Sequence, residues 1–518
     1  MGLLPAKTAR IESGSIQFYK NDKEIIDLLK LSPKAHRKLL GENLAMIFQD
    51  PMTSLNPVKR CGNQLIESLL LHKKISEKQA KKTALELFAE MELENPKKIY
   101  KSYPHQLSGG QKQRVMIAIA LSCNPKILIA DEPTTALDVT VQQSVLALLK
   151  RLQKKFKMSI IFITHDLGVL AQIADNLIIM YEGKIVETGD VNHIFHHAEH
   201  PYTKGLIACR PHPEKRLRKL PSVKDFINYN PDNIVFQSEN IISTEERKEK
   251  HKQIYEQQAI LEIKNLRKQY YSKKYFYSKK EVFYAVKDFS FSLYPGESLG
   301  LVGESGCGKT TLSRALLRLI DIDAGNIIYR GKDLSSLSPQ QMRPYRKKLQ
   351  IVFQDPYSSL NERIRIGDAI KEVLVVHRKD LSAKEQRRKT EEMLEKVNLD
   401  KAFYSRYPHE LSGGQRQRVC IARALVLEPE ILICDESVSA LDVSVQAQVL
   451  NLLNELKETF QLSYLFISHD LSVVKFMADR ILIMQKGEIV EEGNPDEIYA
   501  NPQKAYTKKL IEAIPSFG

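Results

Sequence analysis

The stretch VGESGCGKTT at Val302–Thr311 contains the pattern G-x-x-x-x-G-K-T over Gly303–Thr310. The apolar run ESLGLV precedes it, and a helix over Thr311–Ile320 is predicted to follow. This strand–loop–helix context is the one in which the pattern acts as a phosphate-binding loop. Glycines let the backbone close around phosphate oxygens, and the helix N-terminus adds partial positive charge. The stretch therefore predicts a nucleotide site in an α/β domain.

The residue types in the loop predict individual roles. Lys309 is expected to reach the β- and γ-phosphates of a nucleotide, and the hydroxyl of Thr310 is expected to bind Mg²⁺. The predicted nucleotide-binding residues are Gly303, Glu304, Ser305, Gly306, Cys307, Gly308, Lys309, Thr310 and Thr311.

Acidic, amide and imidazole side chains further along the chain predict hydrolysis at this loop. ILICDE ends in Asp435, which can hold Mg²⁺, and Glu436, which can polarise an attacking water. Gln354 in FQDP can contact both Mg²⁺ and that water, so it is a candidate for both roles. His469 follows the apolar run YLFIS and is predicted to contact the γ-phosphate.

A second phosphate-related motif, LSGGQ, occurs at Leu107–Gln111 and again at Leu411–Gln415. It supplies a serine and two glycines before a helical segment, which favours a phosphate at the helix N-terminus. An ordinary capped helix would have the same pattern. The motif is repeated and has no G-K-[ST] sequence of its own, which favours a role at a phosphate held elsewhere.

The chain contains an internal repeat. YPHQLSGGQKQRVMIAIAL from Tyr103 corresponds to YPHELSGGQRQRVCIARAL from Tyr407, an offset of 304 residues. The same offset relates His165 to His469. The two halves are therefore copies of one domain.

Each copy has the pattern of a largely parallel α/β sheet, in which short apolar runs alternate with helical stretches. The predicted strands are Ile127–Ala130, Ile160–Ile163 and Leu177–Met180 in the first copy, and Ile431–Cys434, Tyr464–Ile467 and Ile481–Met484 in the second. Helices are predicted at Glu77–Met91 and Ala383–Val397.

Composition changes between the copies. Residues 200–258 are polar, charged and proline-containing, which is typical of a tail and linker. We therefore predict a first domain over 1–199, a tail and linker over 200–258, and a second domain over 259–518. The basic, aromatic stretch Tyr271–Lys280 is predicted to be a surface insertion.

The bulk composition limits the class of protein. A chain of 518 residues is too long for one core, and 43% apolar with 27% charged residues fits a globular protein. The net charge of +14 suits an anionic partner or a lysine-rich solvated surface. The six cysteines form no CxxC pair, which fits a reducing cytosol. No apolar run approaches the ~18 residues that cross a bilayer.

The ordered set of phosphate loop, Gln354, LSGGQ, ILICDE, SALD and His469 resembles the ATPase subunits of ABC transporters over nearly the whole chain. The resemblance implies tandem P-loop ATPase domains of ABC type, each with a mostly parallel sheet core and a helical subdomain. It also implies head-to-tail pairing, in which the first copy's motif would contact ATP held by the second copy. The residues expected to make that contact are Ser108, Gly109, Gly110 and Gln111. An aromatic side chain, Tyr270 or Tyr271, is expected to stack on adenine.

QDPMTSLNP and the tail HPYTKGL are further similar to the oligopeptide/dipeptide importer branch, and NPQKAYTKKLIEAIP to fused ATPases of glutathione and small-peptide importers. This implies ATP hydrolysis that powers import of peptides or glutathione, with ATP and Mg²⁺ as cofactors. The expected partners are integral-membrane permease subunits and, indirectly, an external peptide-binding protein, with no nucleic acid. The expected location is the cytoplasmic face of the inner membrane, as a peripheral subunit. The tail contains only Cys209, so no iron–sulfur cluster is expected.

The first copy has no counterpart of the phosphate loop. Aligned backward, ESGSIQF at Glu12–Phe18 matches DAGNIIY at Asp323–Tyr329, which puts the counterpart of Lys309 before Met1. By the length of the second copy, roughly 50–60 residues are missing. A truncated chain and a degenerate ATPase half both explain this. Truncation is favoured because residues that would serve only the missing site are retained: Gln49, Glu132, His165, Ser412 and Gly413.

Alternative functions stay open at this point. They are a soluble tandem ABC ATPase acting on ribosomes or nucleic acid, a nickel importer ATPase, and a non-enzymatic remnant. The linker contains prolines and so differs from a long, charged helical linker, and the sequence around Gln354 resembles that of transporters. Both observations favour a transporter.

Overall fold

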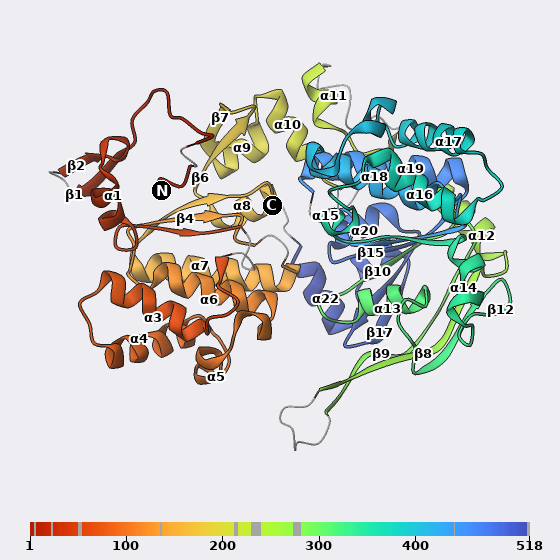
Figure 1. Ribbon diagram of the computed structural model, residues 1–518, viewed down its shortest axis with the longest axis horizontal. Helices are drawn as coiled ribbons and strands as arrows, with labels where there is room; N and C mark the ends of the chain where they lie inside the picture. Colours follow the sequence, from red (N-terminus) through yellow and green to blue (C-terminus); the bar gives the residue numbers. More distant parts are fainter. Residues whose placement is uncertain are drawn as a thin grey trace. The chain divides into compact units, whose positions relative to one another are not determined.

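The computed structural model describes residues 1–4, 7–21, 24–49, 54–134, 137–211, 216–228, 240–272, 281–439 and 441–514. Most of the predicted surface insertion Tyr271–Lys280 therefore lies outside the described residues. The chain divides into two compact units. The first comprises Met1–Leu137 and Val141–Asp175, and the second comprises Asp138–Thr140 and Asn176–Gly518. Each unit contains its own sheet together with helices (Figure 1).

Unit 1 is built on a three-stranded parallel sheet of order β3-β4-β5. The predicted strands of this region are present, each within a residue or so of its predicted bounds. The strands of unit 1 are β1 (Gln17–Asn21), β2 (Glu24–Asp27), β3 (Leu44–Ile47), β4 (Ile127–Asp131) and β5 (Ser159–Ile163). Strands β1 and β2 form a separate antiparallel pair.

Helices cover this sheet and form a helical cluster beside it. They are α1 (Pro33–Leu39), α3 (Cys61–His72), α4 (Glu77–Glu90), α5 (Pro96–Lys101), α6 (Gly109–Leu121), α7 (Val139–Phe156) and α8 (Leu167–Ile173), with 3-10 turns η1 (Leu28–Lys30) and η2 (Pro104–Gln106). Helix α4 agrees with the predicted Glu77–Met91. Its buried Phe88 joins Leu65 of α3, Val115 of α6 and Leu128 of β4 in one core.

Unit 2 contains a six-stranded sheet of order β13-β14-β15-β10-β16-β17, parallel except for the last pair. A four-stranded sheet of order β12-β11-β8-β9 packs against it. The strands are β8 (Leu261–Ser272), β9 (Glu281–Leu293), β10 (Ser298–Val302), β11 (Ala324–Tyr329), β12 (Lys332–Asp333), β13 (Leu349–Val352), β14 (Ile431–Asp435), β15 (Ser463–Ser468), β16 (Arg480–Gln485) and β17 (Glu488–Gly493).

Successive residues of the six-stranded sheet point to opposite faces, so its apolar runs supply two cores. On one face Leu299 and Ile433 pack with α13 and the four-stranded sheet. On the other face Cys434 and Phe466 pack with the remaining helices. The helices of the second copy are α13 (Lys309–Leu316), α14 (Pro339–Arg346), α15 (Pro356–Ser359), α16 (Ile366–His377), α17 (Ala383–Lys396), α18 (Gly413–Leu425), α19 (Val443–Phe460), α20 (Leu471–Met477), α21 (Pro495–Ala500) and α22 (Ala505–Glu512), with 3-10 turns η5 (Lys401–Ser405) and η6 (Pro408–Glu410).

The end of the first copy also belongs to unit 2. It forms the hairpin β6 (Asn176–Tyr181) and β7 (Lys184–Asp190), followed by α9 (Val191–His197). In the second copy the corresponding strand β16 also pairs with β10. The first copy of this sequence has no counterpart of β10, and among the described residues β6 pairs only with β7.

Residues 200–258, which are predicted to be a tail and linker, contain helices that belong to unit 2. They contain α10 (Pro201–Ala208), α11 (Val223–Asn228) and α12 (Thr244–Tyr255). Cys209, Leu217, Leu220 and Val223 are buried in the core formed by the second copy's helices. These four apolar residues are widely spaced in a segment with many charged side chains, so the average composition hides the packing.

The side chain of Asn451 on α19 forms two hydrogen bonds with the backbone of this segment. The N–H of Leu220 donates to Asn451 Oδ1 at 2.9 Å, and Asn451 Nδ2 donates to the carbonyl of Leu220 at 2.8 Å. The residue at the equivalent position of the first copy is Ala147. This difference between the two copies agrees with the structure, because the segment around Leu220 packs on the second copy.

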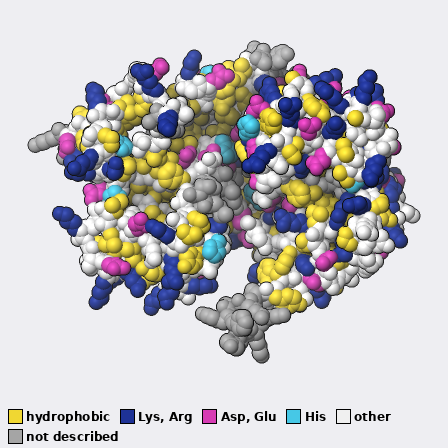
Figure 2. Space-filling view, viewed as in Figure 1, with side chains coloured by type: hydrophobic (Ala, Val, Ile, Leu, Met, Phe, Trp, Pro, Cys, Tyr) yellow, Lys and Arg dark blue, Asp and Glu magenta, His cyan; other side chains and the backbone are white. Residues whose placement is uncertain are grey.

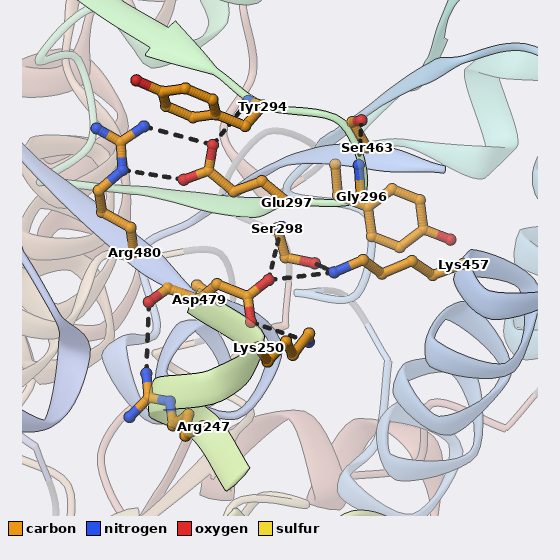
Figure 3. Close-up of polar contacts among 12 residues, drawn as sticks. Arg247, Lys250, Tyr294, Gly296, Glu297, Ser298, Lys457, Ser463, Asp479 and Arg480 are labelled. Carbon is orange, nitrogen blue, oxygen red and sulfur yellow. Dashed lines mark hydrogen bonds and ion pairs between the residues drawn. The ribbon is translucent and has the colours of Figure 1, made fainter. Parts of the chain in front are cut away.

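Helix α12 is joined to the second copy by a network of charged groups (Figure 3). Lys250 of α12 donates to Asp479 Oδ1 at 3.0 Å, and Asp479 Oδ2 accepts from Ser298 N at 2.9 Å and Lys457 Nζ at 3.2 Å. Burial raises the pKa of Asp479, but the charges of Lys457 and Lys250 outweigh it, and the pKa is lowered. The part of the linker that forms α12 is therefore an integral element of unit 2.

We predict that Asn451→Ala loosens the segment around Leu220. The substitution leaves the buried N–H and C=O of Leu220 unpaired, which costs about 1–3 kcal/mol. Amide hydrogen exchange of the peptide containing Leu220 is therefore expected to accelerate by about 5- to 150-fold. Asn454→Ala, on the same helix, is the matched control and leaves this exchange unchanged. Equal protection in both variants would contradict the assigned role of Asn451.

Candidate functional site

The phosphate loop connects β10 to α13 in unit 2. Gly306 and Gly308 have φ of 79° and 117°, a region that favours glycine. A Cβ on Gly308 would lie 1.9 Å from the carbonyl oxygen of Ala285. The helix begins at Lys309 rather than at the predicted Thr311, directly after Gly308, which is its left-handed N-cap. Thr310 and Thr311 lie in its first turn, where backbone N–H groups have no helical partner.

The ammonium of Lys309 lies inside the loop. Lys309 is 4% exposed and donates to the carbonyls of Gly303 at 2.7 Å and Glu304 at 3.0 Å. Its Nζ also lies 3.4 Å from Glu436 Oε1. The loop thus places a buried positive charge where it can reach both a phosphate and the acidic pair.

Asp435 ends β14 and is buried, with 1% exposure. Its Oδ2 accepts a hydrogen bond from Ser313 Oγ at 2.7 Å. Its Oδ1 is buried and has no hydrogen-bond partner among the described residues. Burial, followed by the charge of Glu436, raises the pKa of Asp435. A cation or its bound water would satisfy this oxygen, and Mg²⁺ prefers carboxylate ligands.

Glu436 lies between the two side chains that sequence reasoning grouped with it. Gln354 Nε2, after β13, donates to Glu436 Oε2 at 2.7 Å, and His469 Nδ1, after β15, lies 3.5 Å from the same oxygen. Burial raises the pKa of Glu436, but the hydrogen bond and charge of His469 and the charge of Lys309 outweigh it and lower the pKa. Glu436 is thus an ionised carboxylate that can accept a proton from water.

The backbone of Glu436 is in the left-handed region, with φ of 48°. Its N–H donates to the carbonyl of Ile467 on β15 at 2.9 Å. Left-handed non-glycine residues are sparse and concentrate at functional sites. Here the conformation turns the carboxylate out of the strand direction and toward the loop.

Unit 1 contains the corresponding glutamine, glutamate and histidine, although its copy has no phosphate loop in this sequence. Gln49 Nε2 donates to Glu132 Oε2 at 2.8 Å, and His165 Nδ1 lies 2.9 Å from Glu132 Oε1. Glu132 has φ of 45° and its N–H donates to Ile163 O at 2.8 Å. The three residues retained in the first copy are therefore brought together by the fold.

The LSGGQ motif forms the start of α6, with Ser108 in a capping box. The N–H of Gln111 donates to Ser108 Oγ at 3.3 Å, and Gln111 Oε1 accepts from Ser108 N at 3.1 Å. A Cβ on Gly110 would lie 2.7 Å from Val141 Cγ1, so this glycine is needed for helix packing whatever its other role. Contact of Ser108, Gly109, Gly110 and Gln111 with ATP stays a prediction.

The remaining predicted residues lie in the loop or on β8. Glu304, Ser305 and Cys307 are loop residues, and burial raises the pKa of the Cys307 thiol. Tyr270 is on β8 and 44% exposed, with Lys268 Nζ 5.6 Å from its ring centroid. Its stacking on adenine stays a prediction.

Sequence reasoning missed two residues at the loop. Ser313, one turn into α13, holds Asp435. Tyr506, on α22, accepts a hydrogen bond from the backbone N–H of Glu304 at 3.1 Å. The internal repeat contains a signal for Tyr506, because Tyr202 occupies the same place after the first copy.

Comparison with known proteins agrees with this geometry. The family described as ABC transporter matches residues 5–135 and 286–439. The chain belongs to the ABC transporter family. The family described as oligopeptide/dipeptide transporter, C-terminal region, also matches, at residues 186–228 and 490–518. This ABC ATPase thus has two ABC transporter regions, each followed by a peptide-transporter C-terminal region.

Similar proteins cover nearly the whole ABC ATPase. The chain is 45% identical over 517 residues to the glutathione import ATP-binding protein GsiA of Escherichia coli O6:H1, which spans 99% of this chain and 81% of that protein. It is 44% identical over the same lengths to GsiA of Shigella boydii serotype 4. A solved dimeric ATP-binding cassette in a post-hydrolysis state with ADP and phosphate is 28% identical, with a TM-score of 0.42, covering 45% of this chain and 98% of that one.

Among the described residues, no helix has the length and apolar character required to cross a bilayer.

We predict that Glu436→Gln and Glu132→Gln differ sharply in this ABC ATPase. The first removes the carboxylate next to Lys309 and should lower kcat by roughly 100-fold or more, the usual contribution of a general base. The second changes the copy that has no phosphate loop in this sequence and should leave kcat within about twofold. Steady-state ATP hydrolysis by the purified full chain measures both. Equal losses would mean that the first copy holds a working site.

We predict that His469→Ala changes the pH dependence of hydrolysis. Because His469 lowers the pKa of Glu436, its removal raises that pKa, and the base stays protonated up to a higher pH. The acid limb of the kcat profile should therefore move to higher pH. His165→Ala is the matched control in the first copy and should leave the limb in place. An unmoved limb in His469→Ala would exclude Glu436 as the titrating base.

Proposed function

We propose that this chain powers the import of short peptides or glutathione. The observation that carries the proposal is the peptide-transporter C-terminal region that follows both ATPase copies. The 45% identity to a glutathione import ATP-binding protein supports the same substrate class. Family membership implies membrane permease subunits as partners. We further propose that an external binding protein delivers substrate to them, and that this chain binds them at the cytoplasmic face of the membrane.

In the proposed hydrolysis, ATP phosphates enter the loop between β10 and α13. Lys309 exchanges its bonds with loop carbonyls for bonds with phosphate oxygens. Glu436 accepts the proton of the attacking water, while Gln354 and His469 hold the carboxylate in place. The closed state must bind ATP more tightly than the open state if binding is to move the domains.

The acidic pair fits Mg²⁺ as a companion of ATP. The buried, unpartnered Oδ1 of Asp435 is the observation that supports this fit. Thr310 and Gln354 would supply the other protein oxygens. Bound Mg²⁺ would neutralise charge on the β- and γ-phosphates.

A tandem ATPase acting on nucleic acid is the alternative that the charge of +14 suggests. Figure 2 shows Lys and Arg side chains spread over the visible face among acidic ones. Such a distribution is typical of a solvated surface, whereas nucleic-acid binders gather basic side chains in a stripe or patch. Together with the peptide-transporter C-terminal regions, this favours peptide or glutathione import.

The test is transport in proteoliposomes that contain the full chain with its permease subunits and binding protein. Labelled dipeptide, labelled oligopeptide, glutathione and Ni²⁺ are supplied in separate assays. ATP is supplied on the side of the membrane to which this chain is bound. Uptake of peptide or glutathione is expected, and Glu436→Gln should abolish it without releasing the chain from the membrane. Uptake of Ni²⁺ alone, or co-purification with RNA rather than permease, would overturn the proposal.

A further inference from the structure

One carboxylate of the sheet accepts two backbone hydrogen bonds from the C-terminal tail of the second copy. Glu491 on β17 accepts the N–H of Gln503 at 2.9 Å and the N–H of Lys504 at 3.2 Å. These two residues immediately precede α22, and Thr507 in its first turn is fully buried. The carboxylate therefore holds the backbone immediately before α22.

The same attachment occurs after the first copy. Glu187 on β7 accepts the N–H of Glu199 at 2.8 Å and the N–H of His200 at 3.3 Å. Helix α10 begins at the next residue, with Tyr202 in its first turn. The repetition of the geometry at both tails indicates a feature of the fold rather than an accident of one loop.

The tyrosine in the first turn of α22 reaches the phosphate loop. The backbone N–H of Glu304, the second residue of the loop, donates to the hydroxyl of Tyr506 at 3.1 Å. Burial raises the pKa of Tyr506, so the hydroxyl stays neutral and acts as acceptor for this amide. Its counterpart Tyr202 instead packs on Tyr181, with ring centroids 4.4 Å apart.

We propose that Tyr506 is a positioning residue for the ATP site. It fixes the first amide after Gly303 and so restrains the backbone of the loop before ATP arrives. A loop that is already ordered pays less conformational entropy when it binds phosphate. The tail helix α22 is thus coupled to ATP affinity, and this inference depends on ATP binding alone, whatever substrate is transported.

Tyr506→Phe tests the proposal, because it removes only the hydroxyl. The Kd for Mg-ATP of the purified full chain, measured by equilibrium binding, and the KM are expected to rise about three- to tenfold, the usual loss for one hydrogen bond. The value of kcat should stay within about twofold, and the thermal unfolding midpoint should be unchanged. Tyr202→Phe is the matched control and leaves Kd unchanged. An unchanged Kd in Tyr506→Phe, or an equal rise in the control, overturns the proposal.

Glu491→Gln supplies a second, independent test, since it weakens the attachment of α22 without touching Tyr506. Its Kd for Mg-ATP should rise in the same direction. If both residues act through the position of Glu304, the double variant binds ATP about as weakly as Tyr506→Phe alone. Effects that multiply would show that the two residues act separately, and the proposed coupling would be wrong.

Discussion

The chemistry of this protein depends on the position of β10 between β15 and β16 in a parallel sheet. Val302, the last residue of β10, pairs with Ser468 and with Ile483. Because parallel strands end at the same edge, the phosphate loop after β10, the acids after β14 and His469 after β15 converge there. The 3.4 Å approach of Lys309 to Glu436 is a consequence of that register.

The first copy shows which residues of the site the sheet brings together without a phosphate loop. Gln49, Glu132 and His165 meet with hydrogen-bond geometry, although no loop lies beside them in this sequence. Parallel pairing of β3, β4 and β5 and the left-handed backbone of Glu132 suffice to assemble them. The side-chain amide of Gln49 and the imidazole of His165 form polar contacts with the Glu132 carboxylate, which the backbone orients. The three retained residues therefore have a structural role that does not depend on a missing phosphate loop.

The sequence predicted the parts of the structure that consecutive residues determine. Strands β10, β14 and β15, the loop and the grouping of Gln354, Asp435, Glu436 and His469 follow from short motifs whose order along the chain specifies a sheet edge. Contacts between distant polar residues were not predictable. Leu220 and Asn451 are 231 residues apart, and Lys250 and Asp479 are 229 apart. Composition shows that such groups exist, but only the packed chain determines which ones meet. Comparison of the two copies gives a partial signal for the first of these contacts. At the position where the first copy has Ala147, the second copy has Asn451, which binds the segment around Leu220.

The tail of the second copy and the phosphate loop belong to one closed circuit of bonds. From Glu304 the circuit runs through the Tyr506 hydroxyl, along α22 to the Glu491 carboxylate, and through β17 and β16 back to β10. The covalent chain alone restrains Glu304 only through its neighbours in the loop. Closing the circuit adds a restraint from the opposite side and removes configurations of the loop that could not bind phosphate. Such a restraint also works in reverse, because anything that pulls α22 away from the domain must loosen the loop. The ATP site therefore extends, in energetic terms, into a tail that no nucleotide motif identifies.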